Sequence, residues 1–162
     1  MVWTASTLPA SSALPSNQRH GFVAVIARSW CSPIRPICYR RPMLLIVDAQ
    51  VNQFEPPMAV HDGPAILARL QSLVARARAA QVPVAFVQND GSEIDPDFPG
   101  TPGWELHPQL RPIGDEKTYR KTTTDSFHQT GLLENVRKAG VTSIVIAGMQ
   151  SDHCIDATTR RA

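Results

Sequence analysis

Residues 141–162 read Val-Thr-Ser-Ile-Val-Ile-Ala-Gly-Met-Gln-Ser-Asp-His-Cys-Ile-Asp-Ala-Thr-Thr-Arg-Arg-Ala. The β-branched and apolar run 142–147 is typical of a strand that is covered on both faces. Gly148 ends this run, and Ser151 or Asp152 is suited to cap a following helix. From Cys154 onward the spacing is helical, so the stretch predicts a buried strand, a glycine turn and a helix that begins at a cysteine.

A cysteine in the first turn of a helix lies among backbone N–H groups that have no partner within the helix. This environment lowers the pKa of a thiol and favours the reactive thiolate, so Cys154 is a candidate nucleophile. A free cysteine also packs well as a small apolar residue beneath a sheet. The stretch alone leaves both interpretations open.

The remainder of the chain from Met43 onward alternates strands and helices. Buried strands are expected over 43–47, 82–87 and 141–147, amphipathic or short helices over 66–80 and 131–139, and a long connection rich in Gly and Pro over 89–114. Continuous apolar strands joined by helices indicate an α/β fold: a doubly wound, Rossmann-like parallel sheet with helices on both faces. In such sheets the site lies beyond the carboxyl ends of the strands, where Asp48 and Cys154 both fall.

A cysteine nucleophile also needs a proton acceptor and a positive group nearby. Asp48 suits the first role, although a lone aspartate after a strand is more commonly a turn residue. Lysine is a candidate for the second role, and composition does not distinguish Lys121 from Lys117 or Lys138.

Charge divides the chain in two. The 162 residues carry a formal net charge of +2, but residues 1–42 contain five arginines and no acidic residue. Removing those five charges leaves −3 on residues 43–162, which argues against a nucleic-acid partner. Residues 1–42 are expected to be a disordered or leader-like segment, with an upstream start-site error favoured over a targeting peptide or an ordinary tail. The folded domain is expected over 43–162.

Cysteine usage and hydropathy bear on the compartment. Three cysteines make no disulfide framework, Cys31 and Cys38 fit no zinc pattern, and Cys154 alone in the domain suits a reducing compartment. No apolar run approaches the roughly 18–20 residues that span a bilayer. We therefore expect a cytoplasmic protein without a membrane partner; targeting to an organelle by residues 1–42 is the less favoured alternative.

Three motifs in order resemble those of the isochorismatase-like cysteine hydrolases, a superfamily that includes nicotinamidases and N-carbamoylsarcosine amidase. They are Leu44-Leu-Ile-Val-Asp-Ala-Gln50, then Lys121 followed by Asp125-Ser-Phe127 and Thr130-Gly-Leu132, then Gly148-Met-Gln-Ser-Asp-His-Cys154-Ile-Asp-Ala-Thr158. Each motif is weak alone, but together they cover nearly all of residues 43–162. The resemblance implies hydrolysis of an amide-type C–N bond in a small molecule.

The resemblance also implies a triad of Asp48, Lys121 and Cys154. Cys154 would attack the carbonyl carbon, Asp48 would carry the proton, and Lys121 would lower the pKa of the thiol. A non-proline cis peptide would fall at Met149–Gln150 and point the backbone N–H of Gln150, beside that of Cys154, at the oxyanion. Water would then hydrolyse the thioester.

The resemblance carries further expectations about ligands and assembly. Nicotinamidases hold a metal through an Asp-x-His…His pattern, which His61 and Asp62 do not reproduce, so we expect neither a metal nor another cofactor. Phe54, Trp104 and Phe127 are candidate walls of an apolar substrate pocket. Relatives commonly form oligomers, so a homo-oligomer is expected here.

Members of this superfamily continue beyond the helix that contains the cysteine, whereas this sequence stops at Ala162. We therefore expect a domain that lacks its last strands and leaves one sheet edge uncovered. The alternative to an active hydrolase is an inactive remnant that acts only as an oligomer subunit or a binding scaffold. A third alternative is a hydrolase that is active only in a longer form.

Overall fold

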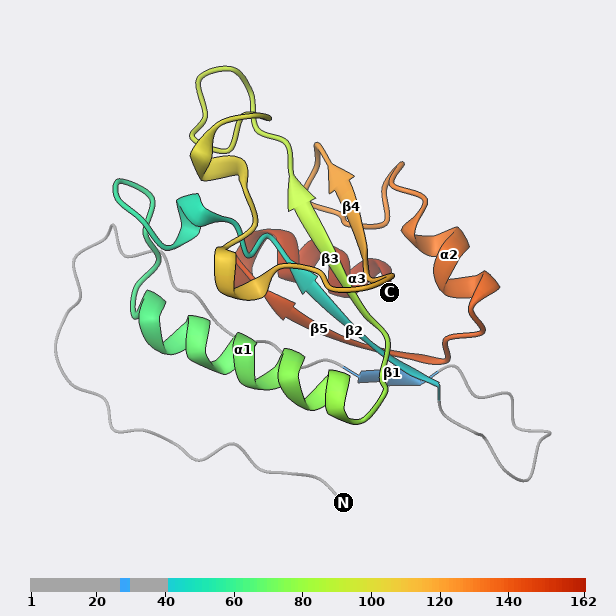
Figure 1. The fold of residues 1–162 in the computed structure, drawn as a ribbon. Coiled ribbons are helices and arrows are strands. Elements are labelled where there is room, and N and C mark those ends of the chain that lie inside the picture. Colours follow the sequence, from blue (N-terminus) through green and yellow to red (C-terminus); the bar gives the residue numbers. More distant parts are fainter. Residues whose placement is uncertain (1–26, 30–40) are drawn as a thin grey trace, which may run out of the picture.

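The computed structural model describes residues 27–29 and 41–162, and Figure 1 shows their arrangement. The strands are β1 (Ala27–Ser29), β2 (Pro42–Val47), β3 (Val84–Asn89), β4 (Lys117–Lys121) and β5 (Ser143–Gly148). The α-helices are α1 (Gly63–Ala79), α2 (Leu132–Lys138) and α3 (Asp156–Arg161), and a single π-helical turn, η4 (Ser151–Ile155), precedes α3. Short 3₁₀ turns cover Val51–Gln53 (η1), Pro102–Trp104 (η2) and Pro108–Leu110 (η3).

The strands form one sheet in the order β1-β5-β2-β3-β4. Strands β5, β2, β3 and β4 run parallel to one another, which confirms the predicted parallel sheet. Strand β1 lies antiparallel to β5 at the outer edge. No sequence pattern predicted this short strand, which falls inside the segment 1–42. Residues 1–26 and 30–40 of that segment, with Cys31 and Cys38, lie outside the described residues, so its predicted leader-like character and the boundary after residue 42 stay predictions.

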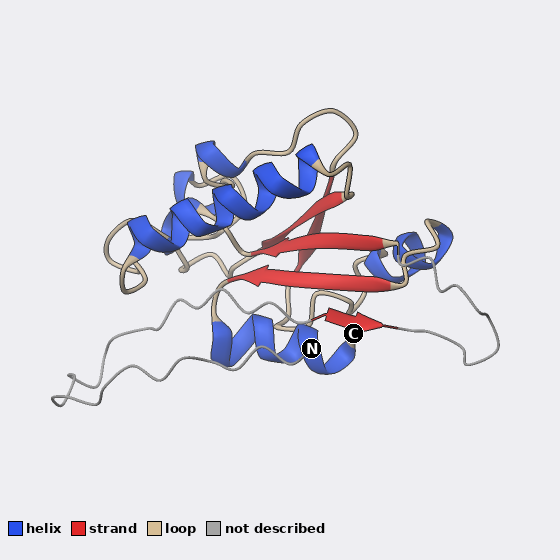
Figure 2. Cartoon of the chain, turned by 90° about the horizontal axis from the view of Figure 1, so that it is seen from below, coloured by secondary structure: helices blue, strands red, loops and turns tan. Residues whose placement is uncertain are grey.

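Helices cover both faces of the sheet, as the alternation of strands and helices predicts. Figure 2 shows α1 on one side of the strands and α3 on the other, and Leu132 and Val136 of α2 belong to the same core cluster as Ile155, which precedes α3. The side chains of β2 alternate between two buried clusters: Leu44 and Ile46 pack toward α1, while Met43, Leu45 and Val47 pack toward α2 and α3. The doubly wound architecture therefore follows from strands that are apolar on both faces.

Strand β4 is a second element that the sequence analysis missed. Its five residues, Lys-Thr-Tyr-Arg-Lys, are mostly polar, and only Tyr119 and Lys121 are buried. Such a strand lacks the continuous apolar run that marks β2, β3 and β5, because it pairs with a neighbour on one side only.

The parallel registers place four strand ends side by side. Val47 lies opposite Val87 of β3 and Gly148 of β5, and Asn89 lies opposite Lys121 of β4. The residues that follow or end these strands therefore gather at one edge of the sheet. Across the described residues, no helix is long and apolar enough to cross a bilayer.

Candidate active site

The strand ends bring Asp48, Lys121 and Cys154 into direct contact. Lys121 Nζ lies 2.9 Å from Asp48 Oδ2 and donates a hydrogen bond to Cys154 Sγ at 3.2 Å. The charge of the Asp48 carboxylate also acts on the thiol, and Asp48 Oδ1 is buried with no hydrogen-bond partner among the described residues. One carboxylate and one thiol thus meet at the same ammonium group, although the three residues come from positions far apart in the sequence.

This set is removed from water. The side chains of Lys121 and Asp48 are 0% and 6% exposed. Burial raises the pKa of Asp48, and the attraction of Lys121 opposes that rise without cancelling it. Burial disfavours the charged ammonium of Lys121, but attraction to Asp48 and then to Cys154 outweighs burial and raises the pKa of the lysine. A carboxylate with a raised pKa, held beside a permanent cation, is suited to accept and return a proton.

The expectation that Cys154 has a lowered pKa is wrong for the resting site. Burial raises the pKa of the thiol to about 12, and the neighbouring charge of Asp48 adds to this effect. Lys121 does lower it, as the resemblance implied, but not enough to dominate. The resting site therefore holds an Asp48–Lys121 ion pair and a neutral thiol.

This electrostatic arrangement predicts the pH dependence of alkylation. The rate at which iodoacetamide modifies Cys154 should rise up to about pH 10 without levelling near the free-cysteine pKa of about 8.5, because the thiolate becomes the main form only above that range. Peptide mass spectrometry would follow Cys154 separately from Cys31 and Cys38. The urea-unfolded chain, titrating near the free value, is the control. A plateau below pH 8.5 in the folded protein would mean that Lys121 dominates the site.

The turn between β5 and Cys154 has an unusual backbone. Gly148 adopts φ +141°, and a side chain there would collide with the carbonyl oxygen of Val47. The peptide bond between Met149 and Gln150 is cis, at the position that the resemblance implies. Gln150 then precedes the π-helical turn, with extended backbone at φ −99° and ψ 148°.

The helix after this turn starts differently from the sequence prediction. Neither Ser151 nor Asp152 occupies the capping position: Gln150 does, without a side-chain cap, and the first turn is π-helical rather than α-helical. Cys154 still lies in this first turn. Capping preferences identified the correct region, but the helical turn begins one residue after Gln150, at Ser151.

A pocket of about 340 Å³ opens beside the triad. Its lining residues are Asp48, Asn52, Gln53, Met58, Asn89, Asp95, Pro96, Asp97, Thr122, Thr123, Thr124, Met149, Gln150, His153 and Cys154. The long connection between β3 and β4, the three threonines after β4 and the turn after β5 supply most of this wall. A small molecule in this pocket would lie against the Cys154 thiol.

Comparison with known proteins identifies the family. Residues 42–162 match the isochorismatase domain. The chain belongs to the isochorismatase family. This confirms the family that the three motifs predicted.

Individual relatives within this family include hydrolases. The chain is 39% identical over 144 residues to a streptothricin hydrolase of Streptomyces noursei, an alignment that covers 89% of this chain and 56% of that protein. It is 27% identical over 180 residues to the ureidoacrylate amidohydrolase RutB of Methylobacterium radiotolerans, covering 88% and 68%. The crystal structure of an isochorismatase from Pseudomonas putida KT2440 superimposes with a TM-score of 0.71 at 25% identity, covering 75% of this chain and 62% of that one. The chain spans about half the length of the streptothricin hydrolases, 56% of one and 43% of another.

The three aromatic residues predicted for the pocket of this isochorismatase domain lie elsewhere. Phe127 is buried in the core on the α2 and α3 face. Phe54 packs against the core on the α1 face and edge-on against His107, with ring centroids 4.9 Å apart. Trp104 donates from its indole to Asp90 Oδ1 at 2.8 Å and carries Arg120 over its ring. Most residues that line the observed pocket are of polar type, and an aromatic residue is more often core than pocket.

Asn89 and Gln50 are site residues whose roles the sequence analysis did not identify. Asn89 Oδ1 accepts a third hydrogen bond from Lys121 Nζ at 3.1 Å. The buried Gln50 side chain holds Asn89 in place, accepting from its backbone N–H at 2.8 Å and donating to its carbonyl at 2.9 Å. The sequence signal that could have identified them is position, because Asn89 ends β3 and Gln50 lies shortly after the end of β2.

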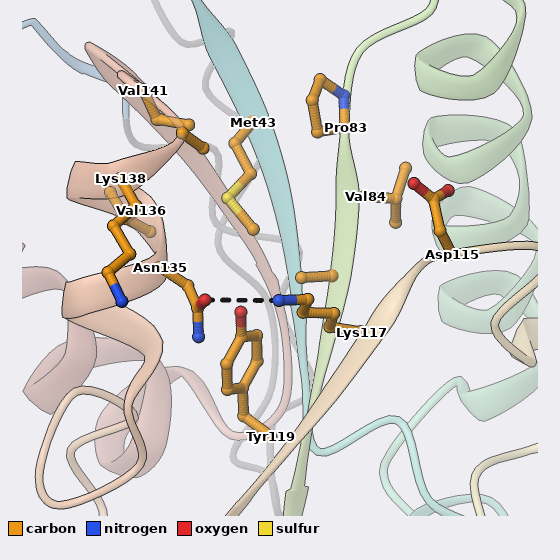
Figure 3. Close-up of a pocket in the computed structure, with 12 residues that line it drawn as sticks. Met43, Pro83, Val84, Asp115, Lys117, Tyr119, Asn135, Val136, Lys138 and Val141 are labelled. Atoms are coloured by element: carbon orange, nitrogen blue, oxygen red, sulfur yellow. Dashed lines mark hydrogen bonds between the residues drawn. The ribbon is translucent and has the colours of Figure 1, made fainter.

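The other lysines are clearly distinct from Lys121. Lys117 lies at the opposite end of β4, about 13 Å away for a strand of this length. There it donates to Asn135 Oδ1 at 3.3 Å, in a second pocket at the strand beginnings that Figure 3 shows. Lys138 pairs with Glu134 on the exposed face of α2. The structure thus separates the three lysines that composition left equivalent.

A buried hydroxyl network joins the helix after Cys154 to the loop after Lys121. Thr158 of α3 is 0% exposed, and its Oγ1 accepts from the backbone N–H of Ser126 at 3.1 Å. The Ser126 and Thr158 hydroxyls are also hydrogen bonded to each other at 2.8 Å. Helix α3 and the 122–130 loop are therefore fixed to one another.

His61 and Asp62, the residues weighed as remnants of a metal site, lie exposed in the turn before α1. They are not among the residues that line the pocket beside Cys154.

Proposed function

We propose that this protein is a cysteine hydrolase that cleaves an amide-type C–N bond of a small molecule through a thioester on Cys154. The observation that carries the proposal is the buried ammonium of Lys121, which contacts the Asp48 carboxylate and the Cys154 sulfur at once. A merely structural ion pair has no need of a thiol at its third corner, opening on a pocket.

The reaction begins with a neutral thiol. As Cys154 Sγ attacks the carbonyl carbon, its proton passes to Asp48, so the thiolate never has to persist in the buried site. Lys121 stabilises the sulfur while it carries negative charge. The backbone N–H groups of Gln150 and Cys154 are proposed to donate to the oxyanion; one such donor typically contributes about 3 kcal/mol to transition-state stabilisation.

The intermediate then collapses with cleavage of the C–N bond. Asp48 returns its proton to the leaving nitrogen, which departs as ammonia or an amine, and the acyl group stays on Cys154 as a thioester. In the second half, Asp48 takes a proton from water, the hydroxyl oxygen attacks the thioester, and the proton returns to the departing sulfur. The products are a carboxylic acid and the regenerated thiol.

The relatives support the class of bond. One is named as an amidohydrolase that acts on ureidoacrylate, and another as a hydrolase of streptothricin. The raised pKa of Asp48 supports its double role, because a group that must both take and give a proton works best with a pKa near the operating pH. We also propose that residues 43–162 form the hydrolase domain. The protein is further proposed to act as a homo-oligomer in the cytoplasm, a reducing compartment.

Trapping the thioester is the direct test. We expect that brief incubation with a small primary amide or lactam, followed by acid quenching, adds the mass of the acyl group to the peptide containing Cys154. Hydroxylamine should remove that mass and release the corresponding hydroxamate. Hydrolysis of the same amide without any acyl adduct on Cys154, under conditions where deacylation is limiting, would contradict covalent catalysis.

A further inference from the structure

The wall of the active-site pocket is acidic. Besides Asp48, whose charge Lys121 balances, two carboxylates line it, Asp95 and Asp97. None of the described residues in this lining is a lysine or an arginine. Hydrogen bonds from the Ser92 side chain and backbone lower the pKa of Asp95, so it is ionised at the mouth of the pocket. The formal charge of the pocket beyond the triad is thus −2.

Asp97 is held beside the triad by a single amide. Asn89 Nδ2 donates to Asp97 Oδ2 at 2.8 Å, while Asn89 Oδ1 accepts from Lys121 Nζ. On its other side Asp97 lies against Gly91, whose N–H donates to its carbonyl at 2.9 Å, and a side chain at Gly91 would collide with the carboxylate. The Asp97 carboxylate is therefore fixed one side chain away from the lysine that contacts the nucleophile.

A buried acceptor without a partner lies in the same wall. Asn52 is 5% exposed, and its Oδ1 makes no hydrogen bond within the structure. A buried carbonyl oxygen of this kind is costly unless a ligand donates to it. Asn52, Asp95 and Asp97 thus present acceptors to the bound molecule, which calls for a ligand with several N–H donors.

We propose that the pocket selects amides that carry a positively charged nitrogen group, such as an ammonium or guanidinium, near the scissile bond, and that Asp97 is the residue that binds this charge. The inference rests on the proposed function for the identity of the reaction. The charge preference is independent of the proposed reaction, because it is a property of the pocket itself. Focusing of a negative potential in a cleft favours cations over neutral molecules of the same shape.

Thiol reagents of matched shape measure this preference without requiring turnover. We expect 2-aminoethyl methanethiosulfonate, a cation, to modify Cys154 about tenfold faster than the neutral propyl reagent of the same length, after each rate is divided by the rate with free cysteine. The anionic 2-sulfonatoethyl reagent should be the slowest of the three. The preference should shrink as salt is raised, because screening weakens it. Peptide mass spectrometry again separates Cys154 from the other thiols.

The variant Asp97→Asn tests the negative charge of Asp97 alone, because the new side chain keeps an oxygen that can accept the hydrogen bond from Asn89 Nδ2. The cation-to-neutral rate ratio should fall severalfold in this variant. Asp115→Asn is the matched control: Asp115 is an exposed carboxylate at the strand beginnings, beside the pocket in Figure 3, and its removal should leave the ratio unchanged. Equal ratios in wild type and Asp97→Asn would overturn the assignment of Asp97.

A second arm uses amides of equal length: 4-aminobutanamide, pentanamide and glutaramate, which are cationic, neutral and anionic. We expect kcat/KM for ammonia release to be about tenfold higher for the cation than for the neutral amide, with the ratio reduced in Asp97→Asn. Hydrolysis with no dependence on charge would overturn the selectivity and leave the proposed function standing. Charge-selective labelling of Cys154 in a protein that hydrolyses no amide would overturn the function and support the selectivity.

Discussion

Replacing Cys154 by alanine is expected to reduce amide hydrolysis by about 10⁴-fold or more. The substitution removes the atom that forms the thioester, and the remaining Asp48 and Lys121 offer no nucleophile of comparable strength in that position. The loss should appear in kcat, because the pocket walls that bind the substrate are unchanged. The measurement is steady-state release of ammonia or amine from any amide that the wild type hydrolyses.

Two controls separate chemistry from folding. The Cys154→Ala protein should keep the circular dichroism spectrum and the melting temperature of the wild type to within a few degrees, since only one sulfur atom is lost. Cys31→Ala and Cys38→Ala remove the other thiols and should retain activity. Undiminished turnover in Cys154→Ala would show that the bond is broken by another route.

Replacing Lys121 by methionine is expected to reduce the free energy of unfolding by about 3–5 kcal/mol. The methionine fills the space of the lysine but leaves the Asp48 carboxylate buried without its cation, and an unpaired buried charge is strongly destabilising. Urea unfolding followed by circular dichroism measures the loss. Lys117→Met, on the exposed end of the same strand, is the matched control and should change stability by no more than about 0.5 kcal/mol.

The pH dependence of this loss has a definite sign. Without Lys121, burial remains the largest influence on Asp48, the charge of Asp97 adds to it, and the pKa stays above the value in the unfolded chain. A group with a raised pKa stabilises the folded state below its unfolded pKa and loses that contribution as pH rises through the folded value. The difference between Lys121→Met and wild type should therefore shrink in acid. The double variant with Asp48→Asn should recover much of the loss at neutral pH, and a loss equal to that of the single variant would contradict this explanation.

The strands that pass through the core could be predicted from sequence because they bury both faces. Strands β2, β3 and β5 are continuous apolar runs, and helix α1 repeats its apolar residues with helical spacing. Strand β4 could not, since an edge strand with two buried side chains has no such signature. The edge strand β1 lies in a segment whose composition resembles a leader, and its pairing depends on tertiary contact with β5.

The candidate site divides in the same way. Asp48 and Cys154 follow from strand ends, whereas Lys121 was distinguished from two other lysines only by the family resemblance. The direction of the pKa shift at Cys154 could not be predicted, because the helix position suggests a lower value and only the three-dimensional burial reverses it. The pocket wall was also missed, since its polar residues come from loops whose course no local pattern specifies.

The contact of Thr158 with Ser126 has a consequence for the evolution of specificity. The nucleophile and the lysine reach the site from different strands. The segments that follow them are nevertheless joined by the buried hydrogen bonds between Ser126 and Thr158. The 89–114 connection, which supplies Asp95 and Asp97, takes no part in these two hydrogen bonds. New substrates can therefore be accommodated by remodelling one wall of the pocket while the machinery on the other wall keeps its alignment.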